Sequence, residues 1–320
     1  MEKWKQSDPD KVARLQGRYD LLRELITHFH AKMPPKTPPL ALYLSTLSLE
    51  THPKSYEEMS EFVDGQLATA LSNLPETHPI KQRLKAKYRQ LVSGIIPQVI
   101  LELAKKPSFE EIMTFLAEAR HRVAEEVCDL PTAKFGRPRL PGNPKIARTP
   151  IVRGGRYDSY LDRILALVPD GLKQDQIQVP EDIDGLTVMN EEIPLSTFLV
   201  CREPPKDPKI DWLFGEFVHK ERVYPAATIV HTDPEHIPAI KARCSVLYEK
   251  LLKNMEIADL AELHWYLAHG MFYTRGSAAI AEWLISGLLG RQVVWDRQPD
   301  LEALLQPNLS EFITSNKDTV

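Results

Sequence analysis

Hydrophobic residues recur at helical spacing through the first 130 residues of the chain. Three of these stripes begin at sequences typical of helix starts: Asp8-Pro9 and the two capping boxes Ser55-Tyr56-Glu57-Glu58 and Ser108-Phe109-Glu110-Glu111. A further helix is predicted to begin at Pro79, and Pro97 should end or kink it, because a proline inside a helix removes a backbone hydrogen bond. Residues 8–130 are therefore predicted to form a bundle of about four or five helices.

The pattern changes after residue 130. Residues 131–157 form a crossover rich in proline and glycine, without Asp or Glu, that carries seven basic residues: Lys134, Arg137, Arg139, Lys145, Arg148, Arg153 and Arg156. Residues 158–320 begin as a mixed segment and end as helices. Three short runs in the mixed segment have the composition of strands: Thr187–Met189, Thr197–Val200 and Ala227–Val230. The predicted fold class is mainly α, with an N-terminal helical bundle, a short mixed segment with a few edge strands, and a C-terminal helical core.

The greatest concentration of potential chemistry lies in residues 259–290, which are predicted to form a helix, a short turn and a second helix. Arg275 and Gly276 stand directly before Ser277, a residue type that favours the N-cap position of a helix. A helix N-terminus presents unpaired N–H groups and a partial positive charge, and glycine allows close approach of the backbone. These three residues are therefore a candidate cradle for a phosphate or a carboxylate.

Other residues would complete such a site. His269 ends the first helix of the pair and is the candidate general base, while Glu282 would orient Arg275 by charge pairing. Arg153 and Arg156 flank two glycines and are candidate auxiliary phosphate contacts. The same pattern also fits a structural interpretation, in which Arg275 caps carbonyl groups and the hairpin is simply core.

The segment His269-Gly270-Met271-Phe272-Tyr273-Thr274-Arg275-Gly276-Ser277 resembles the motif of Fic (Fido) proteins, His-Pro-Phe-x-x-Gly-Asn-Gly-Arg-x-x-Arg between two helices. The histidine and one glycine match, whereas Gly270, Arg275 and Ser277 stand in place of the Pro, the Asn and the first Arg. The resemblance covers residues 259–290. It implies transfer of a nucleotide moiety to a protein hydroxyl, with His269 as the base and the loop holding phosphates.

Composition narrows the function classes further. A formal net charge of −4 over 320 residues makes nucleic acid an unlikely partner. Three cysteines without paired spacing suit a reducing, cytoplasmic compartment, although export without a conventional signal stays open. No apolar run is long enough to span a membrane. His231, Asp233 and His236 lack a standard zinc spacing, so no metal site is predicted.

Three function hypotheses follow. The first is a divergent Fic-like transferase that modifies a protein with a nucleotidyl or phosphoryl group; its cofactor is unidentified, and a nucleotide with or without magnesium is the candidate. The alternative is a non-catalytic effector or adaptor that uses the basic residues of 131–157 to bind an acidic protein partner. The third is a phosphate-ester hydrolase that uses His269, which lacks an accompanying metal set or nucleophile pair in the sequence.

Overall fold

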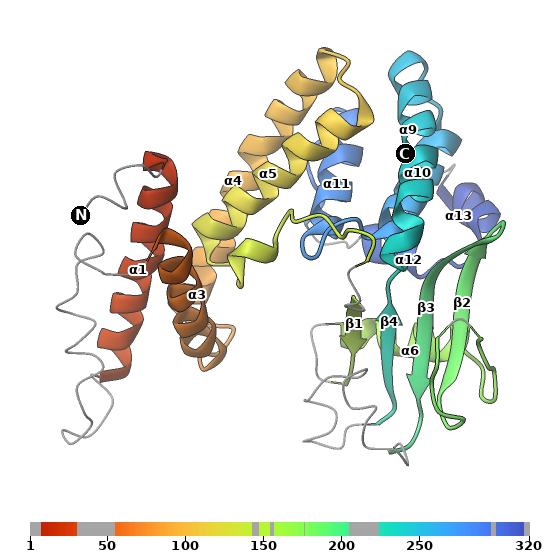
Figure 1. The fold of residues 1–320 in the computed structure, drawn as a ribbon, viewed down its shortest axis with the longest axis horizontal. Coiled ribbons are helices and arrows are strands. Elements are labelled where there is room, and N and C mark those ends of the chain that lie inside the picture. Colours follow the sequence, from red (N-terminus) through yellow and green to blue (C-terminus); the bar gives the residue numbers. More distant parts are fainter. Residues whose placement is uncertain are drawn as a thin grey trace. The chain divides into compact units, whose positions relative to one another are not determined.

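The structure, a computed structural model, describes residues 8–30, 55–142, 147–153, 157–175, 177–204, 224–295 and 299–316. It is mostly helical, with one small four-stranded antiparallel sheet, as the sequence predicts (Figure 1). The chain forms two compact units. The N-terminal unit comprises Met1–Val99 and Thr114–Arg137, and the C-terminal unit comprises Ile100–Met113 and Pro138–Val320. The predicted domain boundaries at 130/131 and 157/158 stay a prediction.

The described residues of the N-terminal unit form α1 (Pro9–His30), α3 (Tyr56–Ser72), the first part of α4 (Pro79–Ala104) and the last part of α5 (Phe109–Val127). Both predicted capping boxes are confirmed, because the Ser55 and Ser108 side chains accept from the backbone three residues on and the Glu58 and Glu111 carboxylates accept in return. The helices bury an apolar cluster that includes Leu15, Leu22, Leu25, Met59, Val63 and Leu67.

Of the two predicted effects of Pro97, ending the helix is wrong, because α4 continues to Ala104, and a kink stays a prediction. A proline inside a helix removes one backbone hydrogen bond and is tolerated where packing compensates. Here Val92, Ile96 and Val99 on the same helix are fully buried. Their burial on both sides of the proline holds the helical path.

The C-terminal unit contains the sheet, with strand order β1-β4-β3-β2. The strands are β1 (Arg148–Ile151), β2 (Asp184–Asn190), β3 (Ile193–Cys201) and β4 (Ala226–Val230). The three predicted strand runs lie in β2, β3 and β4 and are confirmed. Strand β1 falls in the basic crossover and was not predicted. It lies at the edge of the sheet and pairs with β4 on one side. The missing backbone N–H of Pro150 therefore removes no hydrogen bond to a second neighbouring strand.

Helices complete this unit. They are α6 (Leu161–Leu167), α9 (Ile237–Lys253), α10 (Ile257–Gly270), α11 (Ser277–Leu288), α12 (Pro299–Leu304) and α13 (Leu309–Asn316). Helix α10 is central, because it packs against α9, α11, α12, α13 and β3. Trp265 of α10 and Trp283 of α11 are completely buried. In the described parts of the chain, no helix is long and apolar enough to cross a membrane.

We predict that Gly136→Ala destabilises the N-terminal unit by about 3 kcal/mol. Gly136 has a φ of +69°, and an added Cβ would lie 2.2 Å from the backbone oxygen of Ala117 in α5. Gly142→Ala is the matched control, because Gly142 has a φ of +74° but no neighbouring atom within 4 Å, and it should cost about 1 kcal/mol. Urea unfolding of both variants measures the difference, and equal losses would show that the contact with Ala117 contributes nothing.

Candidate functional sites

Hydrogen bonds within the turn between α10 and α11 hold its conformation. Helix α10 ends at Gly270, and Met271 caps it in the left-handed conformation. Gly276, with a φ of 86°, is the N-cap of α11, so the prediction that Ser277 caps the helix is wrong by one residue. The buried Ser277 hydroxyl instead accepts from the Tyr273 N–H at 2.9 Å and donates to the Tyr273 carbonyl at 3.1 Å. Its hydrogen-bonding capacity is therefore used inside the turn.

His269 lies in the core and not at the surface. Its side chain is completely buried, its Nδ1 lies 3.1 Å from the Ser196 hydroxyl of β3, and its ring packs 4.4 Å from that of Trp265. Burial lowers its pKa to about 3, so the ring is neutral. Its carbonyl also accepts from the Thr232 hydroxyl at 2.8 Å. These contacts give His269 a structural role, and its role as a general base stays a prediction that the geometry does not support.

A buried arginine holds the same turn against the sheet. Arg139 donates from Nη1 to the Met271 carbonyl at 3.0 Å and from Nη2 to the Thr232 carbonyl at 2.5 Å. Its backbone N–H donates to the Phe272 carbonyl at 2.9 Å. Burial lowers the pKa of Arg139 to about 10. One of the seven basic residues of 131–157 is therefore a core residue, which corrects its place in the predicted exposed basic strip.

The other predicted site residues do not converge on His269. Arg275 is exposed, whereas His269 is in the core. Arg153 is also exposed and forms ion pairs with Asp158 and Asp162, which raise its pKa. Arg156 lies outside the described residues. Of the arrangement predicted from the sequence, the structure preserves only the adjacency of Arg275, Gly276 and Ser277.

Glu282 lies in a different environment from the predicted one. Burial and the nearby Asp300 carboxyl raise its pKa to about 7, whereas pairing with an arginine lowers the pKa of a carboxyl group. Asp300, in the first turn of α12, also has its pKa raised to about 7 by burial. Its Oδ1 lies 3.8 Å from Nε2 of His264 on α10, which burial keeps neutral by lowering its pKa to about 4. His264 is therefore a residue of the core.

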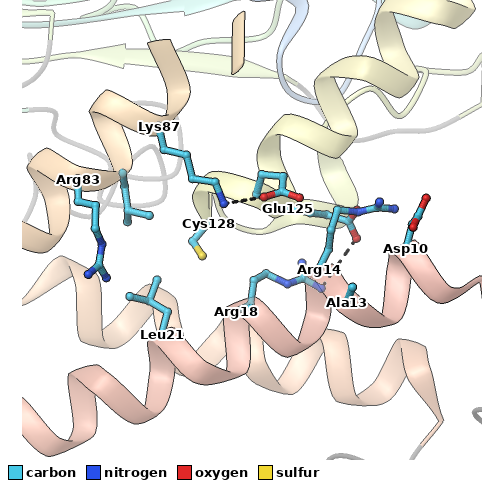
Figure 2. A pocket seen from close by; sticks show the side chains of 12 residues that line it. Asp10, Ala13, Arg14, Arg18, Leu21, Arg83, Lys87, Glu125 and Cys128 are labelled. Atoms are coloured by element: carbon cyan, nitrogen blue, oxygen red, sulfur yellow. Dashed lines mark hydrogen bonds and ion pairs between the residues drawn. The ribbon is translucent and has the colours of Figure 1, made fainter. Parts of the chain in front are cut away.

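A second candidate site is a cleft of about 700 Å³ in the N-terminal unit (Figure 2). We call it the helical cleft. It is lined by residues of α1, α4, α5 and the turn after α5: Asp10, Ala13, Arg14, Gly17, Arg18, Leu21, Arg83, Leu84, Lys87, Glu125, Glu126 and Cys128. None of them was predicted as a site residue, because all except Cys128 belong to helices whose sequences show only an amphipathic pattern.

Charged side chains from different helices meet across the helical cleft (Figure 2). The Arg14 Nε donates to Glu125 Oε2 at 2.6 Å, and the Lys87 Nζ donates to Glu126 Oε2 at 2.6 Å. Glu125 is buried with only 4% of its side chain exposed, whereas 44% of Lys87 is exposed. The pairs nearest the core are therefore fixed, and those at the rim are open to solvent.

Helix α4, which supplies Arg83 and Lys87 to the helical cleft, also carries basic residues that do not line it. Helix α4 carries five basic residues and no acidic residue before Glu102: Lys81, Arg83, Lys85, Lys87 and Arg89. We call this group the α4 basic surface. Hydrogen bonds from Lys81 and Lys85 hold the pKa of the exposed Glu76 down to about 2. The alternating basic residues of this helix were visible in the sequence but were not recognised as a candidate site.

Comparison with known proteins places the chain in a family. A family model described as an avirulence protein, AvrB_AvrC, matches residues 134–319, which is more than half of the chain. A search of curated proteins found no match. The matched family corrects the resemblance to Fic (Fido) proteins, for which no family match was found. The similarity over residues 259–290 rested on a histidine and a glycine at helical-hairpin spacing, a pattern that core packing also produces.

We predict that Glu282→Gln stabilises the protein at pH 8 but not at pH 4. The folded-state pKa of Glu282, raised from 4.5 to about 7, means that the folded protein holds a proton that the unfolded chain releases between these values. The wild-type protein therefore loses stability as pH rises through this range, and glutamine removes a loss of roughly 1–3 kcal/mol. Urea unfolding at both pH values measures this, with the exposed Glu249→Gln of α9 as control. Equal stabilisation at pH 4 and pH 8 would contradict the assignment.

Proposed function

We propose that this chain, which belongs to the AvrB_AvrC family of avirulence proteins, is a bacterial effector that binds an acidic segment of a host protein through the α4 basic surface. The family consists of effectors that act on host proteins. The observation that carries the proposal is the set of five basic side chains on α4 with no acidic residue among them. A patch of one sign of charge attracts and orients a partner of the opposite sign.

The ion pairs on this surface are of a kind that a partner can replace. Arg83 pairs with Glu24 while 58% and 46% of the two side chains remain exposed. Lys85 pairs with Glu76 while 58% and 70% remain exposed. Exposed ion pairs contribute about 0–1 kcal/mol to stability. Acidic side chains of a partner can therefore take over these contacts at little cost to the fold.

The position of the surface also supports the proposal. The matched family segment covers residues 134–319. The part of α4 that belongs to the N-terminal unit, up to Val99, lies before this segment in the sequence. A surface outside the matched segment is where the partner choice of one family member can differ from that of another. Recognition through α4 is therefore compatible with a shared C-terminal part.

The basic crossover of residues 131–157 supports partner binding less well. Arg139 is buried, Arg148 is half-buried, and Arg153 is paired with two aspartates. Lys134 and Arg137 are exposed but belong to the N-terminal unit, whereas Pro138 onward belongs to the other unit. Within the C-terminal unit, the described basic residues of the crossover therefore do not form one continuous exposed strip.

We predict that Lys85→Glu combined with Lys87→Glu weakens binding to a fluorescent glutamate-rich peptide by about tenfold or more in 50 mM salt. Fluorescence anisotropy of the full chain measures the affinity. The wild-type affinity should fall as salt is raised, because the contacts are between exposed charges.

The matched control is Lys250→Glu with Lys253→Glu on α9, which makes the same change in net charge on exposed lysines of the C-terminal unit. Its affinity for the peptide should stay within about twofold of wild type, because these two lysines are not part of the proposed binding surface. Equal losses in the two double variants, or equal binding of a lysine-rich peptide by the wild type, would overturn the proposal.

A further inference from the structure

We infer that pH controls the packing of helix α12 against α10 and α11, through three side chains that meet where these helices join: His264, Glu282 and Asp300. We call these side chains the α12 cluster. While the cluster is uncharged, α12 stays packed, and when its two carboxyl groups ionise, α12 opens locally from its neighbours. All three helices lie in the C-terminal unit, so this inference is independent of the function proposed for the α4 basic surface.

Two buried polar atoms of the α12 cluster face each other without a hydrogen bond. Oδ1 of Asp300 in α12 lies 3.8 Å from Nε2 of His264 in α10. The Asp300 side chain is 10% exposed and that of His264 is 11% exposed. Among the described residues, neither atom has a hydrogen-bond partner. An ionised carboxylate at such a position loses its hydration without gaining a donor, so α12 packs best while Asp300 is neutral.

Glu282 of α11 adds a second carboxyl group to the same contact. It lies close enough to Asp300 for repulsion between the two groups to raise its pKa, in addition to the effect of burial. Two like charges that are held close together in a poorly solvated place repel each other more strongly than they do in water. Ionisation of both groups therefore acts against the packing of α12 on α11 as well as on α10.

The direction of the pH effect follows from the pKa values in the packed and the open state. The pKa of Glu282 is raised from 4.5 and that of Asp300 from 3.8, each to about 7. Burial lowers the pKa of His264 to about 4, so this ring is neutral at pH 5 and above. Packed α12 therefore holds protons that the open state releases, and raising the pH from about 5 to about 7 favours opening. Above pH 7 both states are ionised, and the effect of pH levels off.

Other charged side chains on α12 and α13 face away from the cluster. Glu302 of α12 pairs with Arg163 of α6, at a distance of 2.7 Å and with both side chains nearly half exposed. Glu311 of α13 is exposed and accepts a hydrogen bond from the side chain of Asn308. These carboxylates are solvated, so their ionisation does not act on the packing of α12 in the same way.

The titratable groups of α10 and of the turn before α11 have other surroundings. Glu262 of α10 pairs with Arg243 of α9, and Arg275 in the turn is exposed. His269 faces the carbonyl groups of Ala303 and Gln306 at the other end of α12, but burial lowers its pKa to about 3. This ring is therefore neutral at pH 5 and at pH 8. The charge that changes between these pH values beside α12 is that of the two carboxyl groups.

The short length of α12 makes local opening measurable. It has six residues, Pro299–Leu304, and an isolated helix of this length is not stable in water. Its packing rests on the buried Ala303 and Leu304 and on the Trp265 Nε1–H, which donates to the Gln306 carbonyl at 2.7 Å. The backbone hydrogen bonds of the helix therefore persist only while α12 is packed, and exchange of its amide hydrogens reports its opening.

The test is hydrogen exchange of the full chain, followed by mass spectrometry at pH 5 and pH 8 and corrected for the intrinsic exchange rate at each pH. The protection of residues 303–306 should be about tenfold or more lower at pH 8 than at pH 5, while the protection of α9 changes little. Asp300→Asn should remove most of this difference. Glu282→Gln should reduce it by a separate change on α11, so the test stands even if Asp300→Asn does not fold.

The matched control is Glu302→Gln, which removes an exposed carboxyl group from the same helix and should keep the wild-type difference. Equal protection of wild-type residues 303–306 at the two pH values would overturn the inference. A fall at pH 8 that is equal in α12 and α9 would also overturn it, because the whole unit would then open together. The same is true of a wild-type difference that persists in Glu282→Gln and in folded Asp300→Asn.

Discussion

The buried guanidinium of Arg18 is the interaction on which the N-terminal unit depends. It donates to the Thr132 hydroxyl at 2.6 Å and to the Ser60 hydroxyl at 2.8 Å, and it pairs with Asp64 at 3.2 Å. Asp64 in turn accepts from both the backbone N–H and the hydroxyl of Thr132. These contacts join α1, α3 and the chain after α5. Removing one member of such a buried network leaves an uncompensated charge, so its geometry is held as a unit, and the walls of the helical cleft are held with it.

The C-terminal unit also contains buried polar groups that need hydrogen-bond partners, at the end of α10 next to β3. The last carbonyl groups of a helix need partners, and here the chain is buried. Thr232 donates its hydroxyl to the His269 carbonyl, and Arg139 donates to the carbonyl of Met271. The Ser277 hydroxyl closes the turn itself. A group of His, Arg, Gly and Ser at a helical turn can thus be required by burial of the turn, without any ligand.

Features set by neighbours along the chain could be predicted from the sequence, whereas features set by distant residues could not. The capping boxes at Ser55 and Ser108 and the three strand runs depend on neighbours along the chain, and they were predicted correctly. The passage of α4 through Pro97, the edge strand β1 and the burial of Arg139 and His269 depend on residues far away in the sequence, which a local pattern does not reveal. The basic residues of α4 are also a local pattern, visible in the sequence alone.

Buried and exposed basic residues have different roles in this protein. Arg18 and Arg139 are almost completely enclosed and satisfy buried acceptors, so moving either guanidinium would leave polar groups unpaired in the core. Arg83 and Lys87 make ion pairs of similar length, but water competes for them and their net contribution to folding is small. A partner can therefore exchange only with the second group. Under the proposed function, a partner binds through the exposed group on α4, while the buried Arg18 holds α1, α3 and the chain after α5 together.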